Sequence, residues 1–348
     1  MRPPTIRDVA DRAGVSKSLV SLVLRGSDQV RAEKREAVLR AVRELGYRPN
    51  AAARSLGERR TGPDARPRPE EGGALVGVLL HDLRNPWYVD LLDGLNSLLH
   101  ASGLHMLVAD ARLHRRVGQD PAGPFLDLGA DGLVVVGTLP DPAALETVAA
   151  RMPVVVAGAR EPVPAGVDLV ANDDERGARL ATEHLVGLGH RRIAHLAGYG
   201  AVADLRRRGF EAAVRAAGPD RTALVEAGDM TEEGGYRATV RLLARADRPT
   251  AVFAVNDMTA VGVLSAAEEL GLRVPRDLSV VGYDNTGISR LRHVWLTTVD
   301  GAGHEVGRRA ARCLLDRLEG PGGQGRLLLA PPVLEVRGTT ARPPAVTG

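Results

Sequence analysis

Residues 5–24 read TIRDVADRAGVSKSLVSLVL, and this stretch predicts two short helices joined by a tight turn. Thr5 and Asp8 have the spacing of a capping box, and the apolar residues that follow recur on one helical face. Gly14 ends the first helix, because glycine readily adopts the left-handed conformation found at helix ends. Ser16 is suited to cap the second helix, since its side-chain oxygen can accept a hydrogen bond from a backbone N–H.

A third helix is expected over residues 32–45, where apolar residues again recur at helical spacing. Two short helices with a glycine turn and a supporting third helix form a helix-turn-helix, which places its second helix in the major groove of DNA. Residues 1–60 hold 14 Arg and Lys against 7 Asp and Glu, whereas the rest of the chain is mildly acidic. A basic head therefore predicts contact with a polyanion. The alternative is a small helical cap on a larger domain.

Residues 47–56, YRPNAAARSL, form a short helix-prone segment. A helix of this length is unstable alone in water, so it could become ordered on DNA, where Leu56 can insert between base steps in the minor groove. The same residues could equally form a plain linker helix. Residues 58–73 are rich in proline, glycine and charge, which predicts an exposed flexible linker.

From residue 74 onward, apolar runs alternate with amphipathic stretches. The runs lie at residues 74–80, 104–109, 133–136, 154–157, 167–171, 193–197, 251–255 and 278–282. This alternation indicates βαβ units, and so parallel sheets with helices on both faces. At 348 residues the chain is long enough for more than one domain. The expected fold class is α plus α/β, with a helix-turn-helix domain before the α/β body.

The sequence resembles the LacI/GalR family of bacterial transcriptional regulators through ordered motifs along almost the whole chain. These motifs are TIRDVADRAGVSKSLVSLVLRG, ELGYRPNAAARSL, NPWYVDLLDGL, DGLVVVG, GARLATEHLVGLGHRRIAHLAG, RRRGFEAAV, PTAVFAVNDMTAVGVL, VPRDLSVVGYDN and LTTV. The resemblance implies a body like a periplasmic sugar-binding protein, with two lobes, three crossovers and an effector between the lobes. The implied parts are a helix-turn-helix domain at 1–48, a hinge helix at 49–57, the linker at 58–73 and the effector-binding and dimerisation body at 74–341.

The resemblance also implies how the head binds a two-fold symmetric operator as a homodimer. Carried over by position, the base-facing residues are Lys17, Ser18 and Leu22, the phosphate contacts are Ser16, Ser21 and Tyr47, and the minor-groove hinge residues are Asn50, Ala53 and Leu56. Leu19 replaces the usual Thr and removes a hydroxyl contact to phosphate, whereas Arg25 and Arg31 add charge that can offset the loss. Leu22 can offer an apolar contact to a base or pack at the helix edge.

Ligands of open parallel sheets bind at the carboxyl ends of the strands, so the loops there form the candidate effector site. Their side chains suited to a hydroxyl-rich ligand are Asn85, Trp87, Tyr88, Asp173, Arg206, Asn256 and Asp284. In the family, the positions that match Arg206, Asn256 and Asp284 contact the effector. A sugar is favoured over a nucleobase, because aromatic residues make up only 3% of the chain. Trp87 and Tyr88 could instead be core residues, and Asn256 a helix cap.

Other functions lack a clear sequence signature. Cys313 is the only cysteine, which excludes a multi-cysteine metal site, and we expect neither a metal nor a cofactor. Residues 198–203 match the dinucleotide pattern GxGxxA, but no acidic residue clearly ends the following strand. No P-loop, GxSxG motif or pair of catalytic carboxylates indicates an enzyme. No apolar stretch is long enough for a membrane span and no export signal is evident, so we expect a cytoplasmic protein.

The sequence thus predicts a homodimeric transcriptional regulator, most often a repressor in this family. Its operator affinity would change when a small molecule prefers one arrangement of the lobes. The leucines of residues 89–100 are a candidate dimer face, with core packing as the alternative. Two other classes stay open: a solute-binding or sensory protein that no longer regulates DNA, and an enzyme on a parallel-sheet scaffold.

Overall fold

The computed structural model of the chain describes residues 5–24, 27, 30–45, 74–112, 122–138, 142–320 and 323–344. They form two compact units, a helical head and an α/β body that begins at Leu75. The predicted hinge helix at 49–57 and linker at 58–73 lie outside the described residues, and so do the predicted DNA contacts Tyr47, Asn50, Ala53 and Leu56.

The head consists of the helices α1 (Ile6–Ala13), α2 (Lys17–Leu24) and α3 (Ala32–Leu45). The predicted capping box is formed, because the Thr5 N–H donates to Asp8 Oδ2 at 2.6 Å and the Thr5 side chain accepts from the Asp8 N–H. Gly14 has a φ of 65° and ends α1. The three helices enclose a small apolar core of Val9, Ala10, Val20, Val23, Val30, Val38 and Ala41. The structure therefore confirms the three predicted helices.

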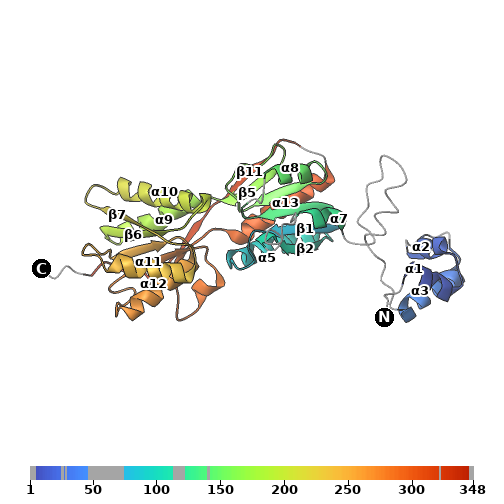
Figure 1. The fold of residues 1–348 in the computed structure, drawn as a ribbon, viewed down its shortest axis with the longest axis horizontal. Helices are drawn as coiled ribbons and strands as arrows, with labels where there is room; N and C mark the ends of the chain where they lie inside the picture. Colours follow the sequence, from blue (N-terminus) through green and yellow to red (C-terminus); the bar gives the residue numbers. More distant parts are fainter. Residues whose placement is uncertain are drawn as a thin grey trace. The chain divides into compact units, whose positions relative to one another are not determined.

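The body has two lobes, each built around a six-stranded sheet (Figure 1). In the first lobe the strand order is β11-β5-β4-β3-β1-β2, and neighbouring strands are parallel. Its strands are β1 (Leu75–Leu80), β2 (His105–Asp110), β3 (Gly132–Val136), β4 (Val154–Ala157), β5 (Asp168–Asn172) and β11 (Leu327–Ala330). Its helices are α5 (Trp87–Ala101), α7 (Gly123–Asp127), α8 (Pro142–Ala149) and α13 (Gly303–Glu319).

The second lobe repeats this plan with the strand order β12-β10-β9-β8-β6-β7. Only β12 runs antiparallel to its neighbour in this sheet. The strands are β6 (Arg192–Ala197), β7 (Thr222–Ala227), β8 (Ala251–Ala254), β9 (Ser279–Tyr283), β10 (Thr297–Asp300) and β12 (Val333–Glu335). The helices are α9 (Asp174–Gly187), α10 (Ala201–Ala216), α11 (Glu232–Leu243), α12 (Asp257–Glu269) and the short 3₁₀ helix η1 (Gly287–Arg290).

The chain passes between the lobes three times, as the resemblance implies. The crossovers lie at residues 172–174, between β5 and α9, at 300–303, between β10 and α13, and at 330–333, between β11 and β12. Each crossover is only a few residues long. A change in the angle between the lobes must therefore be absorbed by these three segments.

The leucine-rich face of residues 89–100 packs largely inside the first lobe. Leu91, Leu95 and Leu99 of α5 are fully buried. Gly94, on the same helix, would place a Cβ 2.0 Å from the His304 carbonyl oxygen, so α5 and α13 are in backbone contact. These three leucines are therefore core residues, and a dimer face on α5 would have to use its other side.

A second close helix contact positions a polar residue at the lobe junction. A Cβ on Gly209 of α10 would lie 2.2 Å from the Glu175 carbonyl oxygen of α9. Phe210 beside it is fully buried in the second lobe. The absence of a side chain at Gly209 lets the two helices touch, and this contact brings Arg206, one turn earlier on α10, to the start of α9.

Substitution of Gly209 tests this contact. Gly209→Ala should destabilise the body by about 1–3 kcal/mol, because the added methyl group must push two helices apart. Gly187→Ala is the matched control, since Gly187 lies on α9 with no atom within 4 Å of an added Cβ. It should be neutral or stabilising by up to about 1 kcal/mol. Urea unfolding measures both; equal stabilities would show that α9 and α10 are not in backbone contact.

Candidate functional site

On the head, the predicted DNA-facing residues of α2 lie mostly at the surface. The exposed ones are Ser16, Lys17 and Ser18, and the half-buried ones are Ser21 and Leu22. Ser16 caps α2, because its Oγ accepts the Leu19 N–H at 3.2 Å. Leu22 packs against the core of the head. Its side chain therefore contributes to packing, and only part of it is available to DNA.

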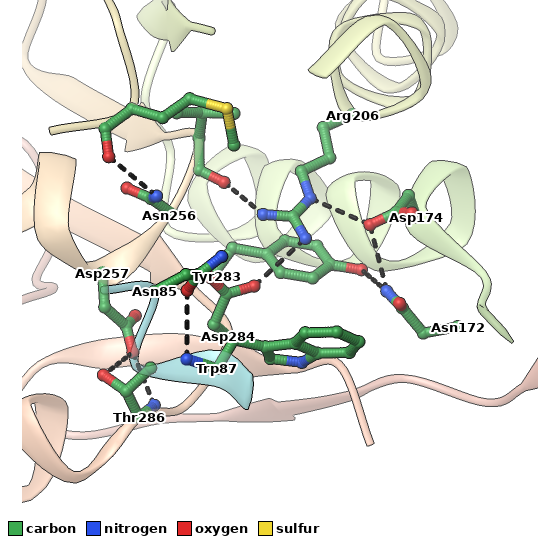
Figure 2. Close-up of polar contacts among 12 residues, drawn as sticks. Asn85, Trp87, Asn172, Asp174, Arg206, Asn256, Asp257, Tyr283, Asp284 and Thr286 are labelled. Atoms are coloured by element: carbon green, nitrogen blue, oxygen red, sulfur yellow. Dashed lines mark hydrogen bonds and ion pairs between the residues drawn. The ribbon is translucent and has the colours of Figure 1, made fainter. Parts of the chain in front are cut away.

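In the body, buried polar side chains gather where the lobes meet, with Arg206 at their centre (Figure 2). Arg206 is 4% exposed. Its Nε donates to Asp174 Oδ1 at 2.9 Å, its Nη2 to Asp284 Oδ1 at 3.1 Å, and its Nη1 to the Val255 carbonyl oxygen at 2.5 Å. The guanidinium carbon lies 3.6 Å from the centre of the Tyr283 ring. Burial lowers the pKa of Arg206, but the two carboxylates raise it by more, so the guanidinium stays charged.

Asp174, the first residue of α9, connects the two lobes and is 1% exposed. Besides the bond from Arg206, it accepts a hydrogen bond of 2.5 Å from the Nε of Arg160, a residue that follows β4 in the first lobe. Asn172, the last residue of β5, donates through Nδ2 to Asp174 Oδ1 at 3.0 Å and to the Tyr283 hydroxyl at 3.2 Å. Burial raises the pKa of Asp174, but the two guanidinium groups lower it by more. The carboxylate is therefore ionised and shared by residues from both lobes.

The sequence patterns did not indicate four members of this cluster, namely Arg160, Asn172, Asp174 and Tyr283. They indicated Asp173, whose side chain instead caps α9 by accepting the Arg176 N–H at 3.0 Å. Two successive aspartates after a strand leave open which one faces the interior. Arg160 lies in a loop without a recognisable motif, so no signal in a single sequence could have found it.

Two of the predicted residues, Asp173 and Asn256, cap helices with their side chains. Asn85 instead forms a turn just before α5, because its Oδ1 accepts the Trp87 N–H at 3.0 Å. Asn256 Oδ1 accepts the Thr259 N–H at 2.8 Å, and its Nδ2 donates to the Met230 carbonyl oxygen at 3.0 Å. Asn256 thus caps α12, and both its side-chain oxygen and its side-chain nitrogen have a described partner. One N–H of the amide is left without a partner among the described residues.

Trp87 and Tyr88 are buried at the start of α5, with exposed fractions of 7% and 8%. A Cβ on Gly301, in the second crossover, would lie 3.6 Å from Trp87 Nε1 and 3.3 Å from both Asn172 Nδ2 and Tyr283 Cε1. Side chains from both lobes therefore surround this crossover. Trp87 Nε1 is buried with no hydrogen-bond partner among the described residues. The Tyr88 hydroxyl lies elsewhere, against Gly137 at the end of β3.

Two further carboxyl groups lie buried in the second lobe, Asp284 and Asp257. Burial raises the pKa of Asp284 to about 7, while Arg206 opposes this rise. Burial also raises the pKa of Asp257 to about 6, against hydrogen bonds from two threonines. Thr298 Oγ1 donates to Asp257 Oδ1 at 2.5 Å, and the Thr286 N–H and Oγ1 donate to Oδ2 at 2.7 and 2.9 Å. Both oxygens of Asp257 are therefore occupied, whereas Asp284 has a described partner on Oδ1 only.

The described residues offer no arrangement suited to a metal ion, since no three His, Cys, Asp or Glu side chains gather at one point. Cys313 is buried in α13. His190 hydrogen-bonds through its ring to Thr250 and Ser279, which indicates a structural role. The glycine-rich segment at 198–203 leads into α10, which begins at Ala201 after the N-cap residue Gly200. None of the described helices has the length and apolar character needed to cross a membrane.

The fold is that of a DNA-binding transcriptional regulator. It combines a helix-turn-helix head with a two-lobed body of the kind that binds ligands between its lobes. Residues 5–50 match the model for bacterial regulatory proteins of the lacI family, and residues 182–340 match the periplasmic binding protein-like domain. The HTH-type transcriptional regulator CelR of Thermobifida fusca is 38% identical over 327 residues, which cover 92% of this chain and 93% of that protein. The chain belongs to the LacI family of transcriptional regulators.

Solved structures agree with this assignment over nearly the full length. The lac repressor dimer bound to operator and the anti-inducer ONPF is 30% identical, with a TM-score of 0.78, and the match covers 98% of this chain and 100% of that one. The transcriptional regulator CelR in complex with cellobiose is 31% identical, with a TM-score of 0.68, and the match covers 97% and 99%. These likenesses confirm the predicted fold class and family.

The pH dependence of stability tests the buried state of Asp257. Its folded pKa of about 6 lies above that of the unfolded chain, so its stabilising contribution is complete below about pH 4 and is lost as the pH rises through 6. The free energy of unfolding of the wild type minus that of Asp257→Asn should fall by up to about 3 kcal/mol between about pH 4 and about pH 7. Urea unfolding at several pH values measures this difference. A difference that rises with pH would mean that Asp257 is ionised in the fold.

Proposed function

We propose that this protein is a repressor whose operator affinity is controlled by a sugar bound between the two lobes. The observation that carries the proposal is the buried Arg206–Asp284 pair at the junction. Both groups give rigid, directional hydrogen bonds of the kind that hold sugar hydroxyls, and both lie near the carboxyl ends of parallel strands. The effector-binding residues we propose are Asn85, Trp87, Tyr88, Asp173, Arg206, Asn256 and Asp284.

The relatives support a sugar as the class of effector. CelR, which matches this chain over nearly its whole length, was solved in complex with cellobiose. Cellobiose is therefore the first probe to use on this protein. We propose binding without turnover, since the polar groups at the junction are held by one another and the relatives are regulators.

For the head, we propose that α2 reads the major groove and that residues 49–57 form a minor-groove hinge, joined to the body by the linker at 58–73. The proposed base-facing residues are Lys17, Ser18 and Leu22, the phosphate contacts Ser16, Ser21 and Tyr47, and the hinge residues Asn50, Ala53 and Leu56. A homodimer follows from the DNA, because one short recognition helix reads too few bases for useful specificity. The lac repressor was solved as a dimer on its operator. The site of action is then the cytoplasm, where bacterial operators lie.

The proposed mechanism is differential binding. A sugar that binds one lobe arrangement more tightly shifts the population of the body toward it. In a dimer this shift changes the spacing of the two hinge segments, and so the affinity for two half-sites.

Selection of genomic DNA fragments by the purified chain, at two salt concentrations, tests the regulator function. We expect an enriched inverted repeat that is lost in a form restricted to residues 74–348, because the head supplies the base contacts. If the full chain instead bound all fragments alike, and only more weakly at the higher salt concentration, the proposal would be contradicted.

The enriched fragment then serves as the probe for the effector. Operator binding is titrated with cellobiose and with a panel of other neutral sugars, for the wild type and for Asp284→Ala. A sugar should change the operator affinity of the wild type, and Asp284→Ala should lose this response while it still binds the operator. An unchanged response in Asp284→Ala would place the effector elsewhere.

A further inference from the structure

Arg160, in the loop after β4, forms a buried ion pair with Asp174 across the lobe junction. Neither residue is one of the predicted site residues. We propose that Arg160 is a positioning residue that sets the angle between the lobes and orients Arg206 through the shared carboxylate of Asp174. It acts on the effector site without touching the effector. Only this effect on the effector site rests on the proposed function; the role of Arg160 in setting the angle between the lobes does not.

The guanidinium of Arg160 is fixed by hydrogen bonds on all three of its nitrogens. Nε donates to Asp174 Oδ2 at 2.5 Å, Nη1 donates to the carbonyl oxygen of Ala159 at 2.8 Å, and Nη2 donates to Asn172 Oδ1. The side chain is 8% exposed and that of Asp174 is fully buried. A planar guanidinium held at three points is oriented as well as charged, which a flexible ammonium group would not be.

The partners of Arg160 lie on both sides of the first crossover. Arg160 and Asn172 belong to the first lobe, whereas Asp174 begins α9 of the second lobe. A rotation of the lobes about the crossovers would separate Arg160 from Asp174 and leave a buried charge without its partner, which is strongly unfavourable. The ion pair therefore favours the lobe arrangement in which it is intact.

The two oxygens of Asp174 divide their partners between the lobes. Oδ2 accepts from Arg160 of the first lobe, and Oδ1 accepts from Arg206 Nε of the second. Arg160 thereby fixes the orientation of the carboxylate that holds Arg206. A ligand that draws Arg206 away from Asp174 would alter the balance of charge at Arg160. The first lobe, which follows the linker in the sequence, would then respond to a ligand bound largely by the second.

Trp87 provides a reporter that needs no effector. The chain has two tryptophans, and Trp295 is 49% exposed, so Trp295→Phe leaves Trp87 as the single tryptophan, which is excited selectively at the red edge of protein absorption. Trp87 is buried beside Gly301, next to Tyr283 of the second lobe. In this background, Arg160→Met in the full chain should raise the quenching of Trp87 by acrylamide several-fold, because the lobes are no longer held together over the indole.

Arg317→Met is the matched control. Arg317 donates through Nε and Nη2 to Asp168, both at 2.7 Å, and Asp168 is fully buried, but both residues belong to the first lobe. The control should lower the thermal stability, as Arg160→Met does, yet leave Trp87 as protected as in the wild type. A merely structural role of Arg160 would make the two variants alike.

Arg160→Lys keeps the charge but loses the planar fork, and it keeps the test decisive if Arg160→Met does not fold. It should give an intermediate rise in quenching. Wild-type quenching in a folded Arg160 variant would overturn the proposal, and so would an equal rise in Arg317→Met. Since no ligand is used, these outcomes are independent of whether a sugar is the effector.

Discussion

A buried carboxylate must be paired, and the pairing of Asp174 organises the junction of the two lobes. Asp174 is ionised in the interior only because Arg160 and Arg206 face it from opposite sides. Several other features follow from this constraint. Gly209 must lack a side chain so that α10 can bring Arg206 to the start of α9. Tyr283 lies under the same guanidinium and completes the contact.

This junction suits a regulator because it is polar, buried and crossed by three short segments. Arg206 is held by two carboxylates of the chain itself. A ligand can therefore shift the lobes only by its differential interaction with the two arrangements, and not by its affinity alone. Asp284, with a described partner on Oδ1 only, and Trp87 Nε1, with no partner among the described residues, mark the places where hydrogen bonding at the junction is incomplete. Such incomplete hydrogen bonding is a reason for a polar ligand to bind there.

The head and the central strands could be predicted from the sequence because their signals are local. Thr5, Asp8 and Gly14 fix α1 through neighbours in the chain, and continuous apolar runs mark strands buried on both faces. The strands β7, β10, β11 and β12 were not predicted. All four lie at or beside a sheet edge, and β7, β10 and β12 lack a continuous apolar run, whereas β11 is a run of four apolar residues that was not recognised as a strand. The expectation of a dimer face on the leucines of α5 was wrong for those that pack against the core.

The candidate site was predicted in part, for a related physical reason. Arg206 and Asp284 follow recognisable motifs and are in contact. Asp174 and Arg160 pair between the first residue of a helix and a loop of the other lobe, so neither periodicity nor spacing indicates them. The one-residue difference between Asp173 and Asp174 decides which carboxylate caps a helix and which enters the interior. That difference depends on how the helix is set against its neighbour, which the sequence alone does not display.

Hydrogen exchange of the full chain, with and without a sugar that changes operator binding, tests the role of the lobe junction most directly. The account predicts slower exchange in the crossovers at residues 172–174, 300–303 and 330–333 and in the first turn of α10, because the effector holds one lobe arrangement. Protection confined to other parts of the body, with these segments unchanged, would contradict it.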